Sequence, residues 1–121
     1  MGQAINTAVI DELLSLSDDG DTSLLVDLIE MFLADAPAKV TAIRQGLAKR
    51  DLHQVELAAH SLKGSAGNLG ATLVQQVCDQ LQRMARSQDK VNEVETLVRQ
   101  LSHPFEQALG ELKALLALHK K

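Results

Sequence analysis

Apolar residues recur every three or four positions along most of the chain, a spacing typical of helices that bury one side. Five segments carry such a series: residues 6–16, 21–49, 52–69, 72–86 and 90–119. Between the first two, Ser17–Gly20 has the composition of a turn. Long amphipathic helices joined by short loops pack antiparallel around a shared core. The pattern therefore predicts an all-α fold: an antiparallel up-down-up-down four-helix bundle over about residues 21–119, with a short extra N-terminal helix over about residues 6–16.

The apolar series also predicts which side of each helix faces the core. In residues 52–69 the inward positions form a narrow stripe of Leu52, Val55, Ala59, Leu62, Ala66 and Leu69. In residues 72–86 the predicted inward positions are Leu73, Val77, Leu81, Met84 and Ala85. We therefore expect the opposite sides of these two helices to face solvent.

Capping and helix-breaking residues set the expected helix ends. Asp51 precedes the third series, where an aspartate side chain can accept a hydrogen bond from a free backbone N–H group. Gly70 follows that series, at the position where a left-handed C-terminal cap is usual. Pro37 and Pro104 fall inside the second and last series, and each removes one backbone donor. We expect a kink or a short break near Ala36 and a kink at Pro104.

Length and composition favour one domain spanning residues 1–121. The chain has 121 residues, of which 45% are hydrophobic and 2% aromatic, with no Trp or Tyr. A core built from Leu, Val, Ile and Ala suits packed helices better than sheets. The net charge of −4 is unevenly spread, because all eight charged residues from Asp11 to Asp35 are acidic. The basic residues beyond them are scattered and form no run, so nucleic-acid binding has little support.

The sequence does not predict a membrane span, a disulfide or a secretory signal. No apolar run reaches the roughly 18 residues that a membrane span requires. The first residues lack the basic and apolar regions of a signal peptide. Cys78 is the only cysteine, which excludes an intramolecular disulfide and fits a reducing compartment. We therefore expect a cytoplasmic protein that does not contact membranes, with a monomer as the default state.

The stretch His60–Gly70 combines helical periodicity with two interior glycines, Gly64 and Gly67. A glycine inside a helix costs about 1 kcal/mol relative to alanine, so these two need a reason. On a helical wheel that starts from Val55, His60 falls at roughly 140°. Gly64 and Gly67 fall on the same side, at roughly 180° and 120°. We therefore expect His60 to point away from the core, beside a notch that the glycines leave open.

The chemistry of these residues fits phosphoryl transfer. A neutral imidazole offers a nucleophilic nitrogen near neutral pH. Lys63, one turn from His60, supplies a cation that can balance the charge of a phosphoryl group. Gln82 and Arg86 are predicted to lie on the outward side of the next helix, where they can donate hydrogen bonds to an imidazole or a phosphate.

The residues His60-Ser61-Leu62-Lys63-Gly64-Ser65, preceded by Ala58-Ala59 and followed by Gly70-Ala71, resemble the signature of the histidine phosphotransfer (HPt) domain family. The family pattern is a histidine, one variable residue, Leu-Lys-Gly and small residues. A further glycine follows ten positions after the histidine. Each of these positions matches, and the helical pattern extends the resemblance over roughly residues 21–119.

The resemblance implies a four-helix bundle whose exposed histidine accepts a phosphoryl group from a receiver-domain aspartate and passes it to another. On that basis His60 would be phosphorylated, Lys63 would balance the phosphate charge and Gly64 would leave space for it. Gln82 and Arg86 match supporting polar positions by their offset in the chain. The implied partners are response-regulator receiver domains or a hybrid sensor histidine kinase. The chain itself would be a carrier without kinase activity or a cofactor, and Mg²⁺ would be held by the receiver.

The residues alone leave three other interpretations open. A phosphate-independent helical adaptor that binds signalling partners would need neither His60 nor Lys63, so their presence counts against it. A metal-binding bundle fits poorly, because His53 and His60 stand two turns apart and Glu56 precedes His60 at the wrong spacing. An enzyme that used His60 as a general base would lack an acid or nucleophile at a telling spacing.

Overall fold

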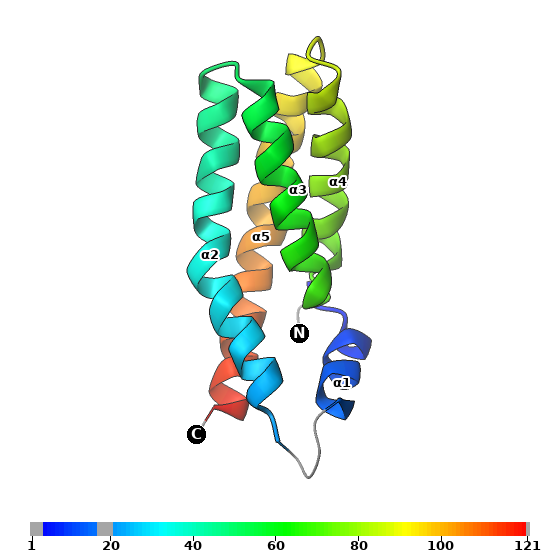
Figure 1. Ribbon diagram of the computed structural model, residues 1–121, viewed down its shortest axis with the longest axis vertical. Helices are drawn as coiled ribbons and strands as arrows, with labels where there is room; N and C mark the ends of the chain where they lie inside the picture. The colour runs from blue at the N-terminus through cyan, green and yellow to red at the C-terminus, as the bar shows by residue number, and fades with distance from the viewer. Residues whose placement is uncertain (1–3, 17–20, 121) are drawn as a thin grey trace.

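The computed structural model describes residues 4–16 and 21–120, and Figure 1 shows its five helices. They are α1 (Thr7–Ser15), α2 (Ser23–Ala48), α3 (Leu52–Asn68), α4 (Thr72–Arg86) and α5 (Val91–His119). The two described ranges contain no strand, and the predicted turn at Ser17–Gly20 lies outside them. Helices α2 to α5 run alternately up and down, each packs against the next, and α5 closes the ring against α2. The predicted all-α four-helix bundle is therefore confirmed, with α1 as the extra N-terminal helix.

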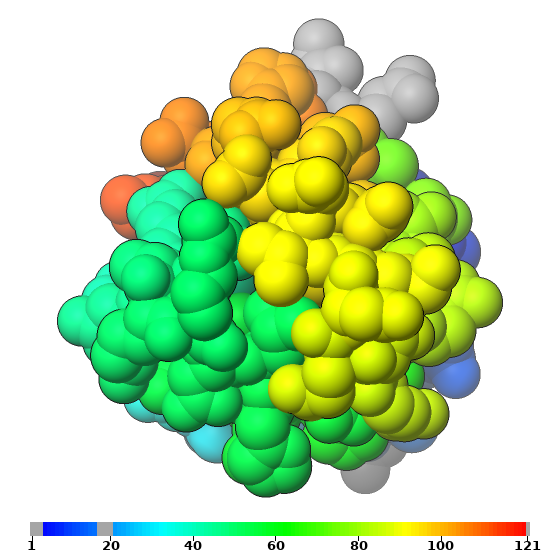
Figure 2. Space-filling model, turned by 90° about the horizontal axis from the view of Figure 1, so that it is seen from above, coloured from blue at the N-terminus to red at the C-terminus, as the bar shows by residue number. Residues whose placement is uncertain are grey.

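The ends of the bundle differ in what covers them. Figure 2 looks down on the end where α2 leads into α3 and α4 leads into α5, and these two connections lie side by side over it. Helix α1 lies toward the other end, against α2. Within the described ranges, none of the helices is long and apolar enough to cross a membrane.

Both proline-containing helices are continuous. Helix α2 passes through Pro37 and α5 passes through Pro104 without interruption. A helix accommodates an interior proline by giving up one hydrogen bond and bending. Figure 1 shows α2 changing direction in its lower half. This fits the predicted kink, whereas the alternative of a short break in α2 was wrong.

Helix α3 forms as the sequence predicts. The Oδ1 atom of Asp51 caps its start by accepting a hydrogen bond from the N–H of Gln54 at 3.1 Å. Its apolar stripe is buried, and every member is at most 2% exposed: Leu52, Val55, Ala59, Leu62, Ala66 and Leu69. Burying this side leaves the side that carries His60 facing outward.

The core side of α4 differs from the prediction. The buried residues of this helix are Val74, Cys78, Leu81 and Ala85, whereas Leu73, which was expected inside, is 45% exposed. Apolar residues stand in adjacent pairs at positions 73–74 and 77–78, so the spacing fits two faces about 100° apart. Packing against α3 and α5 selects the face that contains Val74 and Cys78 rather than the one that contains Leu73 and Val77. The outward side of α4 is therefore rotated relative to the prediction.

The N-terminal segment is tied to the bundle through its backbone. The N–H groups of Ala4 and Ile5 donate to the two carboxylate oxygens of Glu111 at 3.1 and 3.0 Å. The N–H of Asn6 donates to the carbonyl of Gly70 at 2.7 Å. A Cβ at Gly70 would lie 2.9 Å from the Asn6 carbonyl oxygen and 3.0 Å from the Cβ of Val9. Gly70 therefore allows the close approach on which this attachment depends.

Three helices are followed by a residue in the left-handed conformation, and Gln88 after α4, with a φ of 67°, is one of them. Gly70 follows α3 with a φ of 74°, which confirms the predicted glycine cap. Arg50 follows α2 with a φ of 58°. Beside it, the N–H of Asp51 donates to the carbonyl of Gly46 at 2.8 Å, which completes the same kind of cap. A side chain with a Cβ costs roughly 1–2 kcal/mol in this conformation, so Arg50 is a strained position.

Replacing Arg50 with glycine should raise the free energy of unfolding by about 1 kcal/mol, because glycine adopts positive φ without steric strain. Urea unfolding followed by circular dichroism measures the change. Gln45→Gly is the matched control: Gln45 is exposed inside α2, so glycine there should lower the stability by about 1 kcal/mol. A loss of stability in Arg50→Gly would show that the Arg50 side chain contributes more than its backbone strain costs.

Candidate functional site

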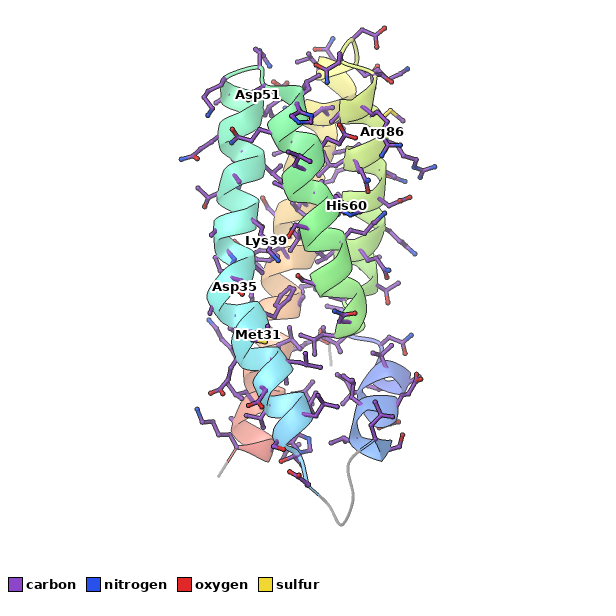
Figure 3. The ribbon with its side chains drawn as sticks, viewed as in Figure 1. Met31, Asp35, Lys39, Asp51, His60 and Arg86 are labelled. Carbon is purple, nitrogen blue, oxygen red and sulfur yellow. The ribbon has the colours of Figure 1, made fainter. Side chains whose placement is uncertain are left out.

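His60 lies at the middle of α3 and is exposed to solvent (Figure 3). Its position follows from the buried stripe, because Ala59 and Leu62 turn inward on either side of it and are both 0% exposed. The imidazole therefore stands on a rigid helix rather than on a loop. A histidine held in this way can meet a partner without the bundle opening.

The two interior glycines of α3 play different parts. A Cβ added at Gly64 would meet nothing within 4 Å, so the surface one turn after His60 is open. A Cβ added at Gly67 would come within 2.8 Å of the Nε2 of Gln75 on α4. The predicted notch is therefore present at Gly64, but the prediction was wrong for Gly67. Gly67 faces α4 because it lies roughly 120° from the centre of the stripe, near the edge where the two helices meet.

Two ion pairs cross between α3 and α4, one on each side of His60. One turn after His60, the Nζ of Lys63 lies 3.4 Å from the Oδ1 of Asp79. One turn before it, the Oε2 of Glu56 accepts a hydrogen bond from the Nε of Arg86 at 2.9 Å. Figure 3 shows Arg86 on α4, farther than His60 toward the end where α2 meets α3. These pairs fix the register of the two antiparallel helices.

This register places Gln82 opposite His60. Gln82 follows Asp79 by three residues, just as His60 precedes Lys63 by three. Gln82 is half-buried rather than outward as predicted, because it lies roughly 40° from Cys78, at the edge of the buried face of α4. Its Oε1 atom is buried and has no hydrogen-bond partner in the described part of the chain. A buried acceptor thus lies at the level of the exposed imidazole.

Lys63 is held between the two helices rather than extended into solvent. Its side chain is 28% exposed, and the carboxylate of Asp79 that it contacts also binds Arg83, with Nη2 2.9 Å from Oδ2. The sequence prediction missed Asp79. A signal was available, since Asp79 and Arg83 stand four residues apart on α4, the spacing of a helical ion pair.

Arg86 is likewise already paired. Its side chain is 61% exposed, while its partner Glu56 is 20% exposed. Glu56 also lies 3.8 Å from the Nδ1 of His53. Gln82 therefore lies at the level of His60. The guanidinium of Arg86 lies one turn away from that level and is bound to Glu56.

An apolar groove between α2 and α3 adjoins this region. Leu57, one turn before His60, is 57% exposed at its edge, and Asp35 and Lys39 lie along α2 (Figure 3). The remaining apolar lining consists of Ala34, Ala38, Ala42 and Ala58. A macromolecule that reached His60 from the α2 side would therefore meet apolar as well as charged surface. Within the described ranges, no three His, Cys, Asp or Glu side chains gather as a metal site.

The family of the chain is settled by comparison with known proteins. Residues 27–118 match the model of the family described as the Hpt domain. The chain belongs to the Hpt domain family. The histidine signature at His60 and the four-helix bundle thus occur together in one recognised domain, as the sequence resemblance predicted.

Relatives of this Hpt domain include proteins named for phosphorelay signalling. Multistep phosphorelay regulator 1 of Schizosaccharomyces pombe is 30% identical over 91 residues, which cover 74% of this chain and 31% of that protein. Phosphorelay intermediate protein YPD1 of Saccharomyces cerevisiae is 27% identical over 88 residues, 72% of this chain and 52% of that protein. Histidine-containing phosphotransfer protein 5 of Arabidopsis thaliana is 25% identical over 113 residues, 91% of this chain and 71% of that protein. The chain therefore spans about a third of the first of these proteins and about half of the second.

Solved structures share the fold at lower identity. Histidine-containing phosphotransfer protein B of Pseudomonas aeruginosa PAO1 superposes with a TM-score of 0.86 at 22% identity, covering 99% of this chain and 100% of that one. The HPT domain of a Shewanella hybrid histidine kinase gives a TM-score of 0.79 at 19% identity, covering 98% and 97%. The bundle, including α1, is thus a recurrent arrangement.

Cys78 should make the stability of the bundle depend on pH. Burial raises the pKa of its thiol from 9.0 to about 12, against the opposing effect of the Lys63 charge. The folded protein therefore holds this proton more tightly than the unfolded chain, so stability is full below pH 9 and falls as the pH rises toward 12. Between pH 8 and pH 10, the wild type should lose about 1.4 kcal/mol more than Cys78→Ala.

Urea unfolding of both proteins at the two pH values checks this difference. The cavity left by Cys78→Ala lowers stability equally at each pH, so it cancels in the comparison. The titration of lysine side chains is common to both proteins and cancels as well. Parallel pH dependence in the two proteins would contradict the expectation.

Proposed function

We propose that the chain is a histidine phosphotransfer protein of a two-component phosphorelay, in which His60 accepts a phosphoryl group from a receiver-domain aspartate and passes it to another. The observation that carries the proposal is the exposed His60 beside the open surface at Gly64, on a bundle of the Hpt family. The relatives named as phosphorelay proteins support it. Here the partner brings the labile phosphoryl group, and the chain supplies the nucleophile.

The transfer step depends more on how the imidazole and the aspartyl phosphate are positioned than on additional catalytic groups. The lone pair of the His60 Nε2 attacks the phosphorus of the receiver aspartyl phosphate, forming the N–P bond as the P–O bond to the aspartate breaks. The aspartate leaves as a carboxylate, and the Nδ1 proton stays on the imidazole ring. Return of the phosphoryl group to a second receiver reverses these changes. A rigid helix surface suits an in-line transfer of this kind, because both reactants approach already oriented.

We assign Gln82 the role of orienting the imidazole. Its buried Oε1 requires a donor, and the Nδ1–H of His60 is a suitable donor at the same level of the bundle. That hydrogen bond would fix the tautomer in which Nε2 carries the lone pair and faces outward. A glutamine paired in this way acts through the histidine rather than on the phosphoryl group.

The remaining polar residues act on charge and space. Lys63 balances the negative charge of the phosphoryl group from one turn away, and Gly64 leaves room for it and for the partner. Arg86 adds a second cation on the other side of His60, shared with Glu56. These roles rest on the family resemblance together with the positions of the residues around His60.

The partners follow from the chemistry of the transfer. Receiver domains, either free-standing or part of a hybrid sensor histidine kinase, carry the aspartyl phosphate and hold the Mg²⁺ that its chemistry needs. The chain is then a carrier without kinase activity of its own. We place it in the cytoplasm, where its single buried thiol fits a reducing environment.

Labelling tests the assignment directly. Incubation with a receiver domain carrying a radiolabelled aspartyl phosphate should transfer label to the chain, and the label should be acid-labile and base-stable, as expected of a phosphohistidine. His60→Gln should abolish the transfer. His53→Gln is the control, because the His53 side chain is 71% exposed on the same helix and should be dispensable. Label that persists in His60→Gln would show that His60 is not the phosphorylated residue.

A bulky side chain at Gly64 should block transfer while the bundle stays folded. A long helical side chain leans toward the preceding turn, so Gln at this position would lie over His60. We expect Gly64→Gln to slow phosphoryl transfer by roughly 10-fold or more, since a misplacement of about 1 Å already costs 100-fold. Its stability should rise by up to about 1 kcal/mol, because a glycine is removed from an open helix position.

Gly110→Gln provides the matched control for that experiment. A Cβ at Gly110 on α5 also meets nothing within 4 Å, so the same gain in stability is expected there. Its transfer rate should equal that of the wild type. A large loss of helicity in Gly64→Gln alone would instead show that Gly64 is needed for the fold.

A further inference from the structure

The charge next to His60 is already balanced before any phosphoryl group arrives. Lys63, the cation assigned to the phosphoryl group, has its Nζ 3.4 Å from the Oδ1 of Asp79. The other oxygen of that carboxylate, Oδ2, lies 2.9 Å from the Nη2 of Arg83. Asp79 therefore stands between two cations, only one of which is on the helix of His60.

A phosphoryl group on His60 would compete with Asp79 for Lys63. It brings up to two negative charges within one helical turn of the lysine, where Cβ atoms three residues apart are about 5–6 Å from each other. Lysine is a compact charge on a flexible stem, so it can exchange one anion for another by rotating its side chain. Arg83 would remain on Asp79 after that exchange. The carboxylate is therefore not left unpaired when Lys63 moves away.

We propose that Asp79 is a positioning residue that holds Lys63 against α4 while His60 is unmodified and yields it to the phosphoryl group after transfer. The inference rests on the proposed phosphotransfer function. It adds a residue that sets the free energy of the phosphorylated state. By competing for Lys63, Asp79 lowers the stability of the phosphohistidine relative to the unmodified histidine. This keeps the phosphoryl group transferable to the next receiver rather than retained on the chain.

The equilibrium between the chain and a phosphorylated receiver domain measures this competition. The ratio of phosphorylated to free chain, divided by the same ratio for the receiver, should rise roughly 3- to 10-fold in Asp79→Asn, since one opposing charge near the site has been neutralised. Glu95→Gln is the control. It removes the same charge from a similar pair, Arg99 Nη1 to Glu95 Oε1 at 3.1 Å, on α5. The ratio in Glu95→Gln should equal that of the wild type.

A double-mutant cycle asks whether Asp79 acts through Lys63. In a Lys63→Met background, adding Asp79→Asn should leave the equilibrium ratio unchanged, because the cation that the carboxylate restrains is gone. A persistent rise in that background would overturn the proposal, since Asp79 would then act by direct repulsion of the phosphoryl group. Equal ratios in Asp79→Asn and Glu95→Gln would overturn it as well.

A structural measurement separates this exchange from a general effect on folding. Phosphoramidate in its ammonium form can serve as the phosphoryl donor: its P–N bond breaks, the Nε2–P bond of His60 forms, ammonia leaves with the three protons it already carries, and the Nδ1 proton again stays on the ring. The NMR signals of the Lys63 side-chain amine and the Asp79 carboxyl carbon should both shift after this treatment, but not in His60→Gln. Phosphorylation without these shifts would refute the exchange alone. A wild-type chain that takes no phosphoryl group from either donor would refute the proposed function itself.

Discussion

The packing of α3 against α4 is the constraint on which the candidate site depends. A narrow apolar stripe turns one side of α3 inward and leaves His60 on the other side. The two ion pairs between the helices then fix their relative height. Burial decides which way each residue points, and the register decides which residues meet. Neither alone would place Gln82 at the level of the imidazole.

The sequence predicted α3 well because its pattern allows one solution. Six of its apolar residues fall at helical spacing on one side, and Leu57 and Ala58 lie outside this stripe, so the buried side and the exposed histidine followed from periodicity and the cap from Asp51. Helix α4 was harder, because adjacent apolar pairs such as Val77 and Cys78 fit two faces equally well. Only contact with the neighbouring helices distinguishes these faces. The half-buried position of Gln82 could therefore not be predicted from α4 by itself.

Contacts between helices could not be predicted from periodicity either. A helical wheel gives the angle of a residue but not the height at which it meets a neighbouring helix. The wheel placed Gly67 beside His60, whereas its Cβ position is occupied by the amide of Gln75 from α4. The pairing of Lys63 with Asp79 was missed for the same reason. The signature identified the family, while the charge balance at the site became visible only in three dimensions.

Two glycines of the signature, Gly64 and Gly70, have separate roles. Gly64 borders open surface, so nothing within the fold requires it. Gly70 has a φ of 74° and admits the Asn6 carbonyl oxygen to within 2.9 Å of where a Cβ would stand, so the fold does require it. A descendant of this chain that lost the proposed phosphotransfer would thus be free to replace Gly64, whereas the fold would still require glycine at position 70. Substitutions in the signature of such a descendant would therefore show whether the reaction or the fold no longer requires it.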